Sequence, residues 1–317
     1  MDIEKKGGKY EFSFEKFTRF VEICKKCGVK YYEIAHMFSQ WGAKSAPNIM
    51  VTENGKTGYM FGWHTDAASK EYEEFLKQYI ASIRGALEKE GIAENTYFHI
   101  SDEPSDESIG DYERAKNIIK PLIGNSKTMD ALSHPQFCEK GLVECPVTII
   151  NEIHKFLEYG FENQCVYYCC FPQDIYPNSF LAMPSGRIRI LGFLMYKYNI
   201  KGFLHWGFNF YNSALSKYPI NPYVTTSADG AYPSGDGFIV YPGVNDVYGS
   251  VRGEVTFRAI QDMNLCFALE SLVGREAVVA MIDRVAGRDL RFDDYPCDNE
   301  FFDNLCGEMI EEIEKSL

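Results

Sequence analysis

The stretch Asn95-Thr-Tyr-Phe-His-Ile-Ser-Asp-Glu-Pro104 decides the fold class. Side chains alternate across a β-strand, so one face would carry the polar and mixed residues Tyr97, His99, Ser101 and Glu103. Phe98 and Ile100 share the opposite face, and Pro104 cannot donate to a strand ladder. The pattern predicts a strand over residues 95–101, with its apolar side toward helices and its polar side toward the lumen of a barrel.

On both sides of this strand, helical and strand patterns alternate along the chain. Strands are predicted at residues 29–36, 95–101, 127–132, 147–151, 164–170 and 200–206, with a further candidate at 238–241. Helices are predicted at residues 14–28, 66–90, 108–119, 152–159 and 185–198. Repeated β-α units of this length predict a parallel sheet covered by helices.

The barrel and the doubly wound sheet both fit this alternation, and the residues at the strand ends distinguish them. G-x-G-x-x-G is absent, and Gly55-Lys56-Thr57 has Met50 where a P-loop needs its first glycine. Polar and aromatic residues instead follow the predicted strands: His36, Asp102, Glu103, Asp130, Asn151, Glu152, Tyr168, His205 and Trp206. Barrel enzymes place their chemistry at these strand ends, which favours a (β/α)8 TIM-like barrel.

The predicted barrel is one domain over residues 1–317, with a helical C-terminal region at 250–317. Six clear strands are fewer than the eight of a barrel, and the chain opens with a helical pattern, so we expect the first strand to lie upstream. Residues 207–249 are too long for an ordinary loop and predict an insertion that forms one wall of the site.

Composition limits the partners of the chain. Its 45 acidic and 32 basic side chains give a net charge of −13, so the surface would repel a phosphate backbone and nucleic acid is not an expected partner. The first residues lack the apolar core of a signal peptide, and no run approaches the roughly twenty apolar residues that span a bilayer. We expect a cytoplasmic protein without a membrane partner, although a truncated N-terminus would leave secretion or the cell surface open.

The ten cysteines are scattered through the chain, and several lie in apolar runs where a thiol behaves as a small hydrophobic group. We therefore expect them to be reduced. Cys24 and Cys27 have metal-like spacing, but no second pair accompanies them. Neither a metal nor a cofactor is predicted.

Asp102 and Glu103 are the sharpest chemical feature of the sequence. Neighbouring acids repel each other and burial raises the pKa of at least one, so one acid stays protonated beside one carboxylate. Cleavage of a glycosidic bond requires this combination. The acids that follow, within residues 105–107, are better explained as the start of the next helix.

A second feature is the segment Gly202-Phe-Leu-His-Trp-Gly-Phe-Asn-Phe-Tyr-Asn212. Aromatic faces stack on sugar rings, and Asn side chains both donate to and accept from hydroxyl groups. Trp206, Asn209 and Tyr211 therefore predict a platform for a sugar, and Trp41 is expected at its rim.

Four segments together resemble the catalytic domain of glycoside hydrolase family 123, a group also known as domain of unknown function 4091. They are Phe98-His-Ile-Ser-Asp-Glu-Pro104, Gly202-Phe-Leu-His-Trp-Gly-Phe-Asn-Phe-Tyr211, Gly235-Asp-Gly-Phe-Ile-Val-Tyr-Pro-Gly243 and residues 250–262. The resemblance implies a (β/α)8 barrel that acts as a β-N-acetylgalactosaminidase on a β-linked GalNAc glycan. It also implies a preceding β-sandwich domain, which we expect to be missing here.

The adjacent Asp-Glu pair of that family matches Asp102 and Glu103. The resemblance implies that Glu103 protonates the leaving oxygen while the 2-acetamido group of the substrate attacks, and that Asp102 stabilises the acetamido nitrogen. Substrate-binding roles are predicted for His36, Trp41, His99, Asp130, Tyr168, His205, Trp206, Asn209, Tyr211 and Tyr241. Two alternatives stay open: a retaining glycosidase with Glu152 as the nucleophile, and a sugar-binding barrel without catalysis.

Overall fold

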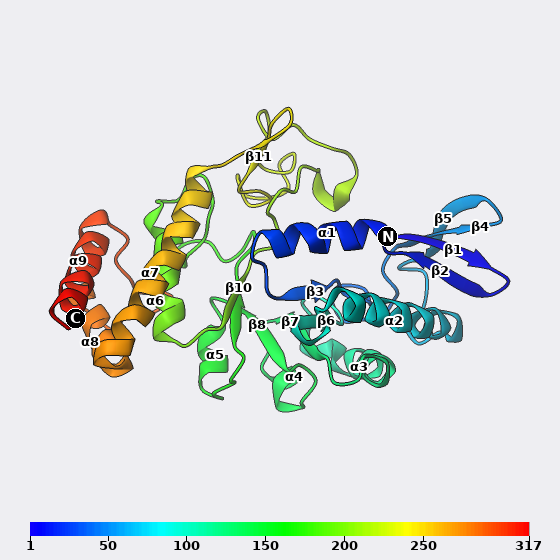
Figure 1. Ribbon diagram of the computed structural model, residues 1–317, viewed down its shortest axis with the longest axis horizontal. Helices are drawn as coiled ribbons and strands as arrows, with labels where there is room; N and C mark the ends of the chain where they lie inside the picture. Colours follow the sequence, from blue (N-terminus) through cyan, green and yellow to red (C-terminus); the bar gives the residue numbers. More distant parts are fainter. Residues whose placement is uncertain (317) are drawn as a thin grey trace. The chain divides into compact units, whose positions relative to one another are not determined.

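The computed structural model describes residues 1–316 as a mixed α/β chain (Figure 1). The chain divides into two compact units, Met1–Val147 and a second unit from Thr148 onward. The division falls inside β8 (Cys145–Ile149), a strand of a sheet with the order β10-β9-β8-β7-β6-β3. The division into two units does not test the prediction of one domain over residues 1–317, which stays a prediction.

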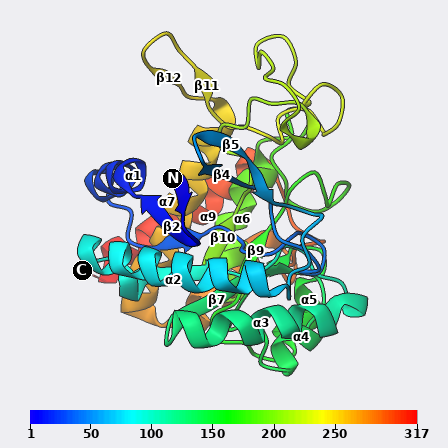
Figure 2. The same ribbon diagram turned by 90° about the vertical axis from the view of Figure 1, so that its right-hand side faces the viewer.

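The parallel strands of the first unit are β3 (Tyr32–Ile34), β6 (Thr96–His99) and β7 (Lys127–Leu132). β6 lies between the other two, with Phe98 paired to Ile34 on one side and to Thr128 on the other. Phe98 and Ile100 are fully buried, so the apolar side predicted for this strand is confirmed. α2 (Lys70–Glu90) and α3 (Ile109–Ile123) precede and follow β6 in the chain and lie side by side (Figure 2).

The start of α2 is later than the predicted residue 66. Ser69 caps the helix by accepting the N–H of Tyr72 at 3.4 Å, whereas Asp66 accepts the N–H of Ala68 at 2.7 Å and closes a turn before the helix. The helix ends as predicted at Gly91, whose φ of +68° is the left-handed conformation that glycine adopts at little cost. Both Asp66 and Ser69 are good cap residues, so the sequence pattern did not separate them.

The first unit also contains a four-stranded sheet that was not predicted. Its strands β1 (Asp2–Lys6), β2 (Lys9–Ser13), β4 (Ile49–Glu53) and β5 (Lys56–Phe61) have the order β2-β1-β4-β5. The expectation that the chain opens with a helix is therefore wrong, because α1 (Glu15–Lys26) follows the first hairpin.

Both hairpins of this sheet turn on two residues with positive φ. Gly7 and Gly8 have φ of +55° and +82°, and Asn54 and Gly55 have φ of +52° and +74°. Positive φ at both central residues is the requirement of a type I′ turn, which joins antiparallel strands directly. Gly55 is thus a hairpin residue, and the likeness of its surroundings to the end of a P-loop has no structural meaning.

In the second unit, β9 (Cys165–Tyr167) and β10 (Gly202–Leu204) are parallel, with Tyr167 paired to Leu204. α5 (Ile153–Leu157) precedes β9, and α6 (Gly186–Lys197) joins the two strands. α6 packs closely on α7 (Val251–Val273), since a Cβ at Gly192 would lie 2.0 Å from the carbonyl oxygen of Ala259.

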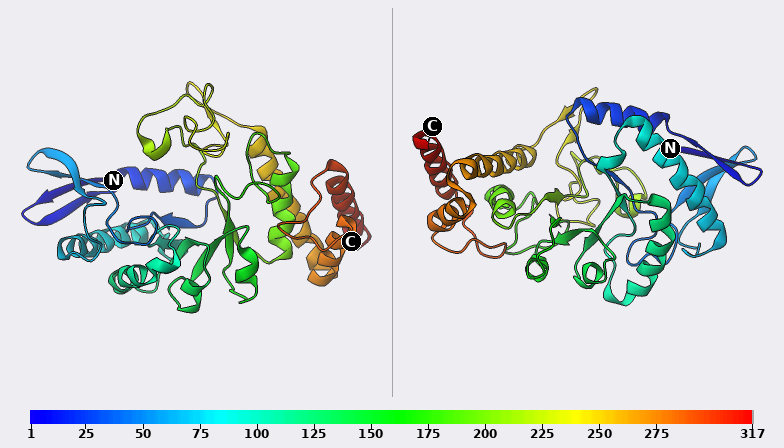
Figure 3. Two further views of the ribbon diagram at one scale, coloured as in Figure 1. Left: turned by 180° about the vertical axis from the view of Figure 1, so that it is seen from behind. Right: turned by 60° about the horizontal axis from the view of Figure 1, so that its bottom comes forward.

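Within residues 250–316, the described part of the predicted C-terminal region, the chain forms three helices. α8 (Arg275–Ala286) and α9 (Asn299–Ser316) both contact α7, and Figure 3 shows these three helices together in orange and red. The short elements of the chain are η1 (Ala93–Asn95), η2 (Asp106–Ser108), α4 (Gln136–Glu139) and η3 (Ala214–Ser216). No helix within residues 1–316 has the length and apolar content needed to cross a bilayer.

The candidate strand at 238–241 does not join the parallel sheet. Phe238 forms an isolated bridge with Asn209, and β11 (Tyr241–Pro242) pairs antiparallel with β12 (Val247–Tyr248). The sheet formed by the described residues has six strands with β3 and β10 at its edges, so it is open. The fold prediction is thus confirmed as α/β with a parallel sheet and the insertion after Trp206, but not as a closed barrel of eight strands.

Candidate active site

The backbone of Asp102 and Glu103 leaves the carboxyl end of β6 beside the segment that leaves β3. Met37 N–H donates to the carbonyl of His99 at 3.2 Å, and Phe38 N–H donates to that of Ile100 at 3.0 Å. Trp41 N–H donates to the carbonyl of Asp102 at 2.7 Å. These bonds continue the pairing of β3 with β6 beyond both strands, and they hold the backbone that carries the two acids.

The Asp102 carboxylate is held by the same segment. Gln40 Nε2 donates to Asp102 Oδ2 at 2.7 Å, so the amide fixes the orientation of the carboxylate. The loop after Gln40 depends on Gly42, whose φ is +125°; a Cβ there would lie 2.3 Å from Cβ of Ser108. Gly42 therefore lets the loop that follows Gln40 pack against the start of α3.

Glu103 has a backbone conformation that is rare for its residue type. Its φ is +45°, in the left-handed region, which costs a residue with a Cβ roughly 1–2 kcal/mol relative to the right-handed one. The alternation of side chains along the strand therefore stops before Glu103, and both acids are half-buried. Residues in such conformations cluster at functional sites, because the surrounding structure must hold them there.

His99, three residues before Asp102, lies between two carboxylates. Its Nδ1 is 2.6 Å from Oε1 of Glu33, and its Nε2 is 2.8 Å from Oδ1 of Asp130. Burial alone would lower the pKa of His99, but the two neighbouring carboxylates outweigh it and raise the pKa to about 10. The imidazole is therefore protonated at neutral pH and links β3, β6 and β7.

Asp130 is fully buried on β7, and the protein engages both of its carboxylate oxygens. Oδ1 accepts the N–H of Ser101 at 3.0 Å as well as facing His99, and Oδ2 accepts the hydroxyl of Tyr112. Burial raises the pKa of Asp130, while these partners act in the opposite direction. Such contacts favour a positioning role for His99 and Asp130, and direct sugar binding by either stays a prediction.

Glu33 and Tyr112 belong to this network and were missed in the sequence. Glu33 lies in a predicted strand, and only the pairing of β3 with β6 brings it to His99. Tyr112 looks like an ordinary core residue of α3, so no sequence signal indicates that its hydroxyl serves Asp130.

Two further predicted residues lie in the first unit. Nδ1 of His36 is 2.6 Å from the carbonyl oxygen of Phe38, and its ring meets the ring of His99 edge-on at 5.8 Å. Trp41 is 56% exposed and packs against Trp63 with ring centres 5.8 Å apart. An exposed indole one residue from Gln40 fits the predicted rim position.

In the second unit, the predicted residues after β10 gather around Asp236, which sequence reasoning missed. Asp236 is fully buried; its Oδ2 accepts Nε1–H of Trp206 at 3.1 Å, and its Oδ1 is 3.7 Å from Nε2 of His205. The buried ring of Tyr168 meets His205 at 5.4 Å. The signal for Asp236 was its place in Gly235-Asp-Gly237, inside one of the family-like segments.

Trp206 leaves 40% of its surface exposed, and its ring packs edge-to-face with Phe210 and Tyr232, whose ring centres lie 4.9 Å and 5.3 Å away. We call Trp206, Phe210 and Tyr232 the Trp206 cluster. An indole that is held by its N–H and by neighbouring rings and is still partly exposed is suited to contact a sugar.

Tyr211 and Tyr241 lie together on a second ring group around Phe238. Their ring centres are 5.8 Å and 5.2 Å from that of Phe238, and the Tyr211 hydroxyl donates to the carbonyl of Val240 at 2.8 Å. Asn209 is exposed beside the bridge to Phe238. Buried Arg252 donates to the carbonyls of Gly235 and Phe238, at 2.5 Å and 2.6 Å, and so fixes the loop on both sides of Asp236.

Comparison with known families decides the relationship of the chain. The model of the glycoside hydrolase 123 catalytic domain matches residues 1–269. The chain belongs to glycoside hydrolase family 123. The resemblance carried by the four sequence segments is thereby confirmed.

Among solved structures, the family 123 chain is similar to a family 123 glycoside hydrolase from Clostridium perfringens that was studied for glycolipid glycan hydrolysis. The TM-score is 0.68 at 16% identity, over 99% of this chain and 56% of the other. At this identity the likeness shows the fold alone, and the chain spans a little over half the length of that neighbour. No curated protein matches the chain.

Glu152, the alternative nucleophile, lies at the start of α5 in this family 123 chain. Asn151 Nδ2 donates to its Oε1 at 2.9 Å, and Lys155 forms an ion pair with Oε2. An acid at a helix N-terminus paired with a lysine three residues later is a common stabilising arrangement. These contacts explain Glu152 without catalysis, and its role as nucleophile stays an untested alternative.

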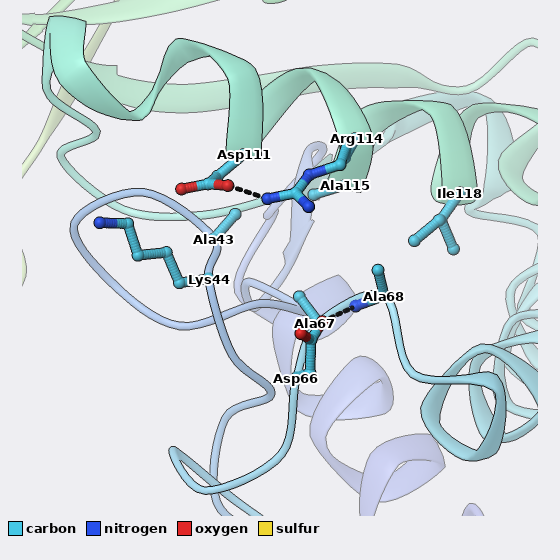
Figure 4. A pocket seen from close by; sticks show the side chains of 9 residues that line it. All are labelled: Ala43, Lys44, Asp66, Ala67, Ala68, Asp111, Arg114, Ala115 and Ile118. Carbon is cyan, nitrogen blue, oxygen red and sulfur yellow. Dashed lines mark hydrogen bonds and ion pairs between the residues drawn. The ribbon is translucent and has the colours of Figure 1, made fainter.

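A cavity of about 200 Å³ in the first unit contains none of the predicted site residues. Figure 4 shows that its charged groups serve the protein itself: Asp111 is paired with Arg114, and Asp66 accepts the N–H of Ala68. Lys44 also lines this cavity. Across residues 1–316, His, Cys, Asp and Glu form no cluster of three that is suited to hold a metal ion.

Proposed function

We propose that this chain is a retaining β-N-acetylhexosaminidase that uses the 2-acetamido group of its substrate as the nucleophile. The observation that carries the proposal is the adjacency of Asp102 and Glu103 at one strand end. In retaining enzymes with a protein nucleophile, two carboxyl groups stand on opposite sides of the bond, roughly 5–5.5 Å apart. Consecutive residues held on one backbone segment are poorly placed for that geometry, and they suit a mechanism in which the substrate supplies the nucleophile.

In the first step, Glu103 donates its proton to the glycosidic oxygen while the acetamido oxygen attacks the anomeric carbon. The bond to the leaving group breaks, and an oxazolinium ring forms on the sugar. In the second step, Glu103 takes a proton from water as the water attacks the same carbon, which opens the ring and restores the acetamido group. One glycoside and one water thus give two products, with Glu103 returned to its starting state.

Asp102 is the partner of the acetamido nitrogen in this mechanism. The nitrogen becomes positive as the ring forms, so a fixed carboxylate stabilises the transition state more than the ground state. The contact with Gln40 supports this role, because the amide holds the carboxylate by Oδ2. In the proposed complex, Oδ1 would accept the substrate N–H. The charge of Asp102 is thereby aimed before the substrate binds.

The proposed substrate is a β-linked N-acetylgalactosamine at the end of a glycan. Membership of family 123 supports a carbohydrate substrate. The neighbour from Clostridium perfringens, studied for glycolipid glycan hydrolysis, supports glycolipid glycans as the substrate class. The partly exposed indole of Trp206 supports binding of a pyranose ring.

The test compares chromogenic β-GalNAc, β-GlcNAc and β-galactoside side by side. We expect turnover only of the two acetamido sugars, with β-GalNAc the faster. Cleavage of the β-galactoside at an equal rate would contradict substrate assistance, and trapping of a fluorosugar on Glu152 would then identify a protein nucleophile. Sugar binding without turnover of any substrate would instead favour the non-catalytic barrel.

A further inference from the structure

Cys169 and Cys170 form a pair of adjacent thiols just beyond β9. Their Sγ atoms are 3.9 Å apart, and both side chains are half-buried. We propose that this pair is a dithiol site that binds soft thiophilic ligands such as trivalent arsenicals, and that hydrogen peroxide oxidises it to a disulfide. The proposal is independent of the proposed hydrolase activity.

The backbone around the two thiols is held in place by Asn178, which is fully buried. Its Nδ2 donates to the carbonyls of Cys169 and Pro172, at 3.0 Å and 2.8 Å, and its Oδ1 accepts the N–H of Ser179 at 2.7 Å. Cys169 N–H also donates to the carbonyl of Phe171 at 2.9 Å. The turn is therefore ordered before any ligand binds, which lowers the entropy cost of bringing both sulfurs to one atom.

The dithiol borders the Trp206 cluster. Burial raises the pKa of the Tyr232 hydroxyl, and the charges of Cys170, Asp236 and Cys169 raise it further, so this hydroxyl lies near both cysteines. The ring of Tyr232 is in turn 5.3 Å from that of Trp206. A ligand or a disulfide at residues 169–170 would therefore change the surroundings of Trp206, and the fluorescence of Trp206 would report that change.

Oxidation by peroxide balances as follows. One thiolate attacks a peroxide oxygen, which forms a sulfenic acid and releases water after protonation. The second thiol attacks that sulfur and displaces the hydroxyl group as a second water. The two sulfurs together lose two electrons and two protons, and one peroxide becomes two waters.

The disulfide would be readily reversible. Adjacent Cα atoms are about 3.8 Å apart across a trans peptide, below the roughly 4.4–6.8 Å that separates them in ordinary disulfides. A strained disulfide is more easily reduced, so we expect glutathione to reopen it.

The test treats the full chain with phenylarsine oxide, whose arsenic condenses with two thiols and releases one water. Mass spectrometry should find one phenylarsenic group per chain on the peptide that contains residues 169–170. Excess monothiol should leave it bound, a small dithiol should remove it, and peroxide should instead remove two hydrogens from the same peptide. This mapping needs no variant.

Two variants and a matched control sharpen the test. Cys169→Ser and Cys170→Ser should each weaken arsenical binding by roughly 10²–10⁴-fold, since the second thiol acts at high effective concentration. Cys27→Ser, which removes the exposed member of the Cys24 and Cys27 pair, should bind normally. Arsenical binding should change the tryptophan fluorescence of the chain. Trp206→Phe should keep arsenical binding but lose this fluorescence change.

The proposal would be overturned by labelling at another cysteine, or by a serine variant that binds the arsenical as tightly as the native chain. A peroxide-induced disulfide that joins different residues would also overturn it. None of these measurements involves turnover, so failure of the hydrolase proposal would leave their outcome unchanged.

Discussion

The carboxyl ends of β6 and β10 both carry a histidine close to a buried aspartate, yet the two ends are stabilised differently. At the end of β6, His99 faces two carboxylates at 2.6 Å and 2.8 Å, and Asp130 also binds Ser101 and Tyr112. At the end of β10, the nearest carboxylate oxygen of Asp236 is 3.7 Å from His205.

The remaining contacts follow the same division. Continued backbone pairing and charge hold the end of β6, which carries the two acids. Ring packing and one hydrogen bond, from Trp206 to Asp236, hold the end of β10, which presents a partly exposed indole. The comparison indicates that the end of β6 fixes charged groups, whereas the end of β10 offers contact area. Changes at the end of β6 should therefore alter the catalytic rate, and changes at the end of β10 should alter sugar binding.

The largest expected effect is that of Glu103→Gln. A general acid contributes roughly 10²–10⁴-fold to the rate, so the variant should lose most of its activity on substrates with poor leaving groups. It should lose much less on activated aryl glycosides, which need little protonation. The measurement is kcat/KM for one substrate of each kind, and an equal loss on both would exclude the acid role.

His99→Gln tests whether charge holds the end of β6. It removes the cation between Glu33 and Asp130, and breaking a buried ion pair typically costs about 3–5 kcal/mol in the free energy of unfolding. The matched control is His205→Gln, which should cost clearly less because its carboxylate lies at 3.7 Å. If both variants lose the same free energy of unfolding in a denaturant titration, charge does not hold the end of β6 more strongly than the end of β10.

The stability loss caused by His99→Gln should depend on pH. The pKa of folded His99 is about 10, above its ordinary value of 6.5, so its stabilisation is fully present below pH 6.5 and is lost as the pH rises through 10. The stability difference between the native chain and His99→Gln should therefore shrink between pH 6.5 and 10. A difference that is constant over this range would show that His99 acts by packing alone.

Asp102→Asn keeps the shape of the side chain and removes its charge. We expect kcat to fall by about 10²-fold with little change in KM, the scale of losing one preorganised electrostatic partner. A thiazoline analogue of the cyclised intermediate should bind the native chain more tightly than the variant. Equal binding of the analogue to both would argue against charge stabilisation at this position.

The smallest effect is expected at the end of β10. Trp206→Ala should weaken a competitive sugar inhibitor by roughly 1–3 kcal/mol if the indole stacks on the ring, with Trp206→Phe losing less. Thermal unfolding of each variant separates the two roles. A lower melting temperature with unchanged inhibitor binding would identify Trp206 as a packing residue.

Prediction from sequence succeeded where one short pattern sets one feature. Gly91 ends α2, and the apolar and polar faces of residues 97–101 identified β6. It failed where a feature depends on pairing between distant segments. Glu33 reaches His99 only through the register of β3 with β6, and Asp236 reaches Trp206 from a loop with no periodic pattern.

The four-stranded sheet was missed for a different reason. Asn54-Gly55 and Gly7-Gly8 are good hairpin signals. The strands on either side of Gly7-Gly8, Asp-Ile-Glu-Lys-Lys and Lys-Tyr-Glu-Phe-Ser, however, lack the apolar content of a core strand. The positive φ of Glu103 had no sequence signal, because glutamate rarely adopts this conformation and its type gives no indication of it.

The order β2-β1-β4-β5 leaves β2 and β5 as the outer strands of that sheet. An outer strand offers unsatisfied backbone groups to any other chain, which is a route to aggregation. β2 carries exposed Lys9 and Glu11, and β5 begins at exposed Lys56. A second molecule that added a strand here would have to bury or oppose these charges, so the charged residues on the two outer strands disfavour the addition of a further strand to this sheet.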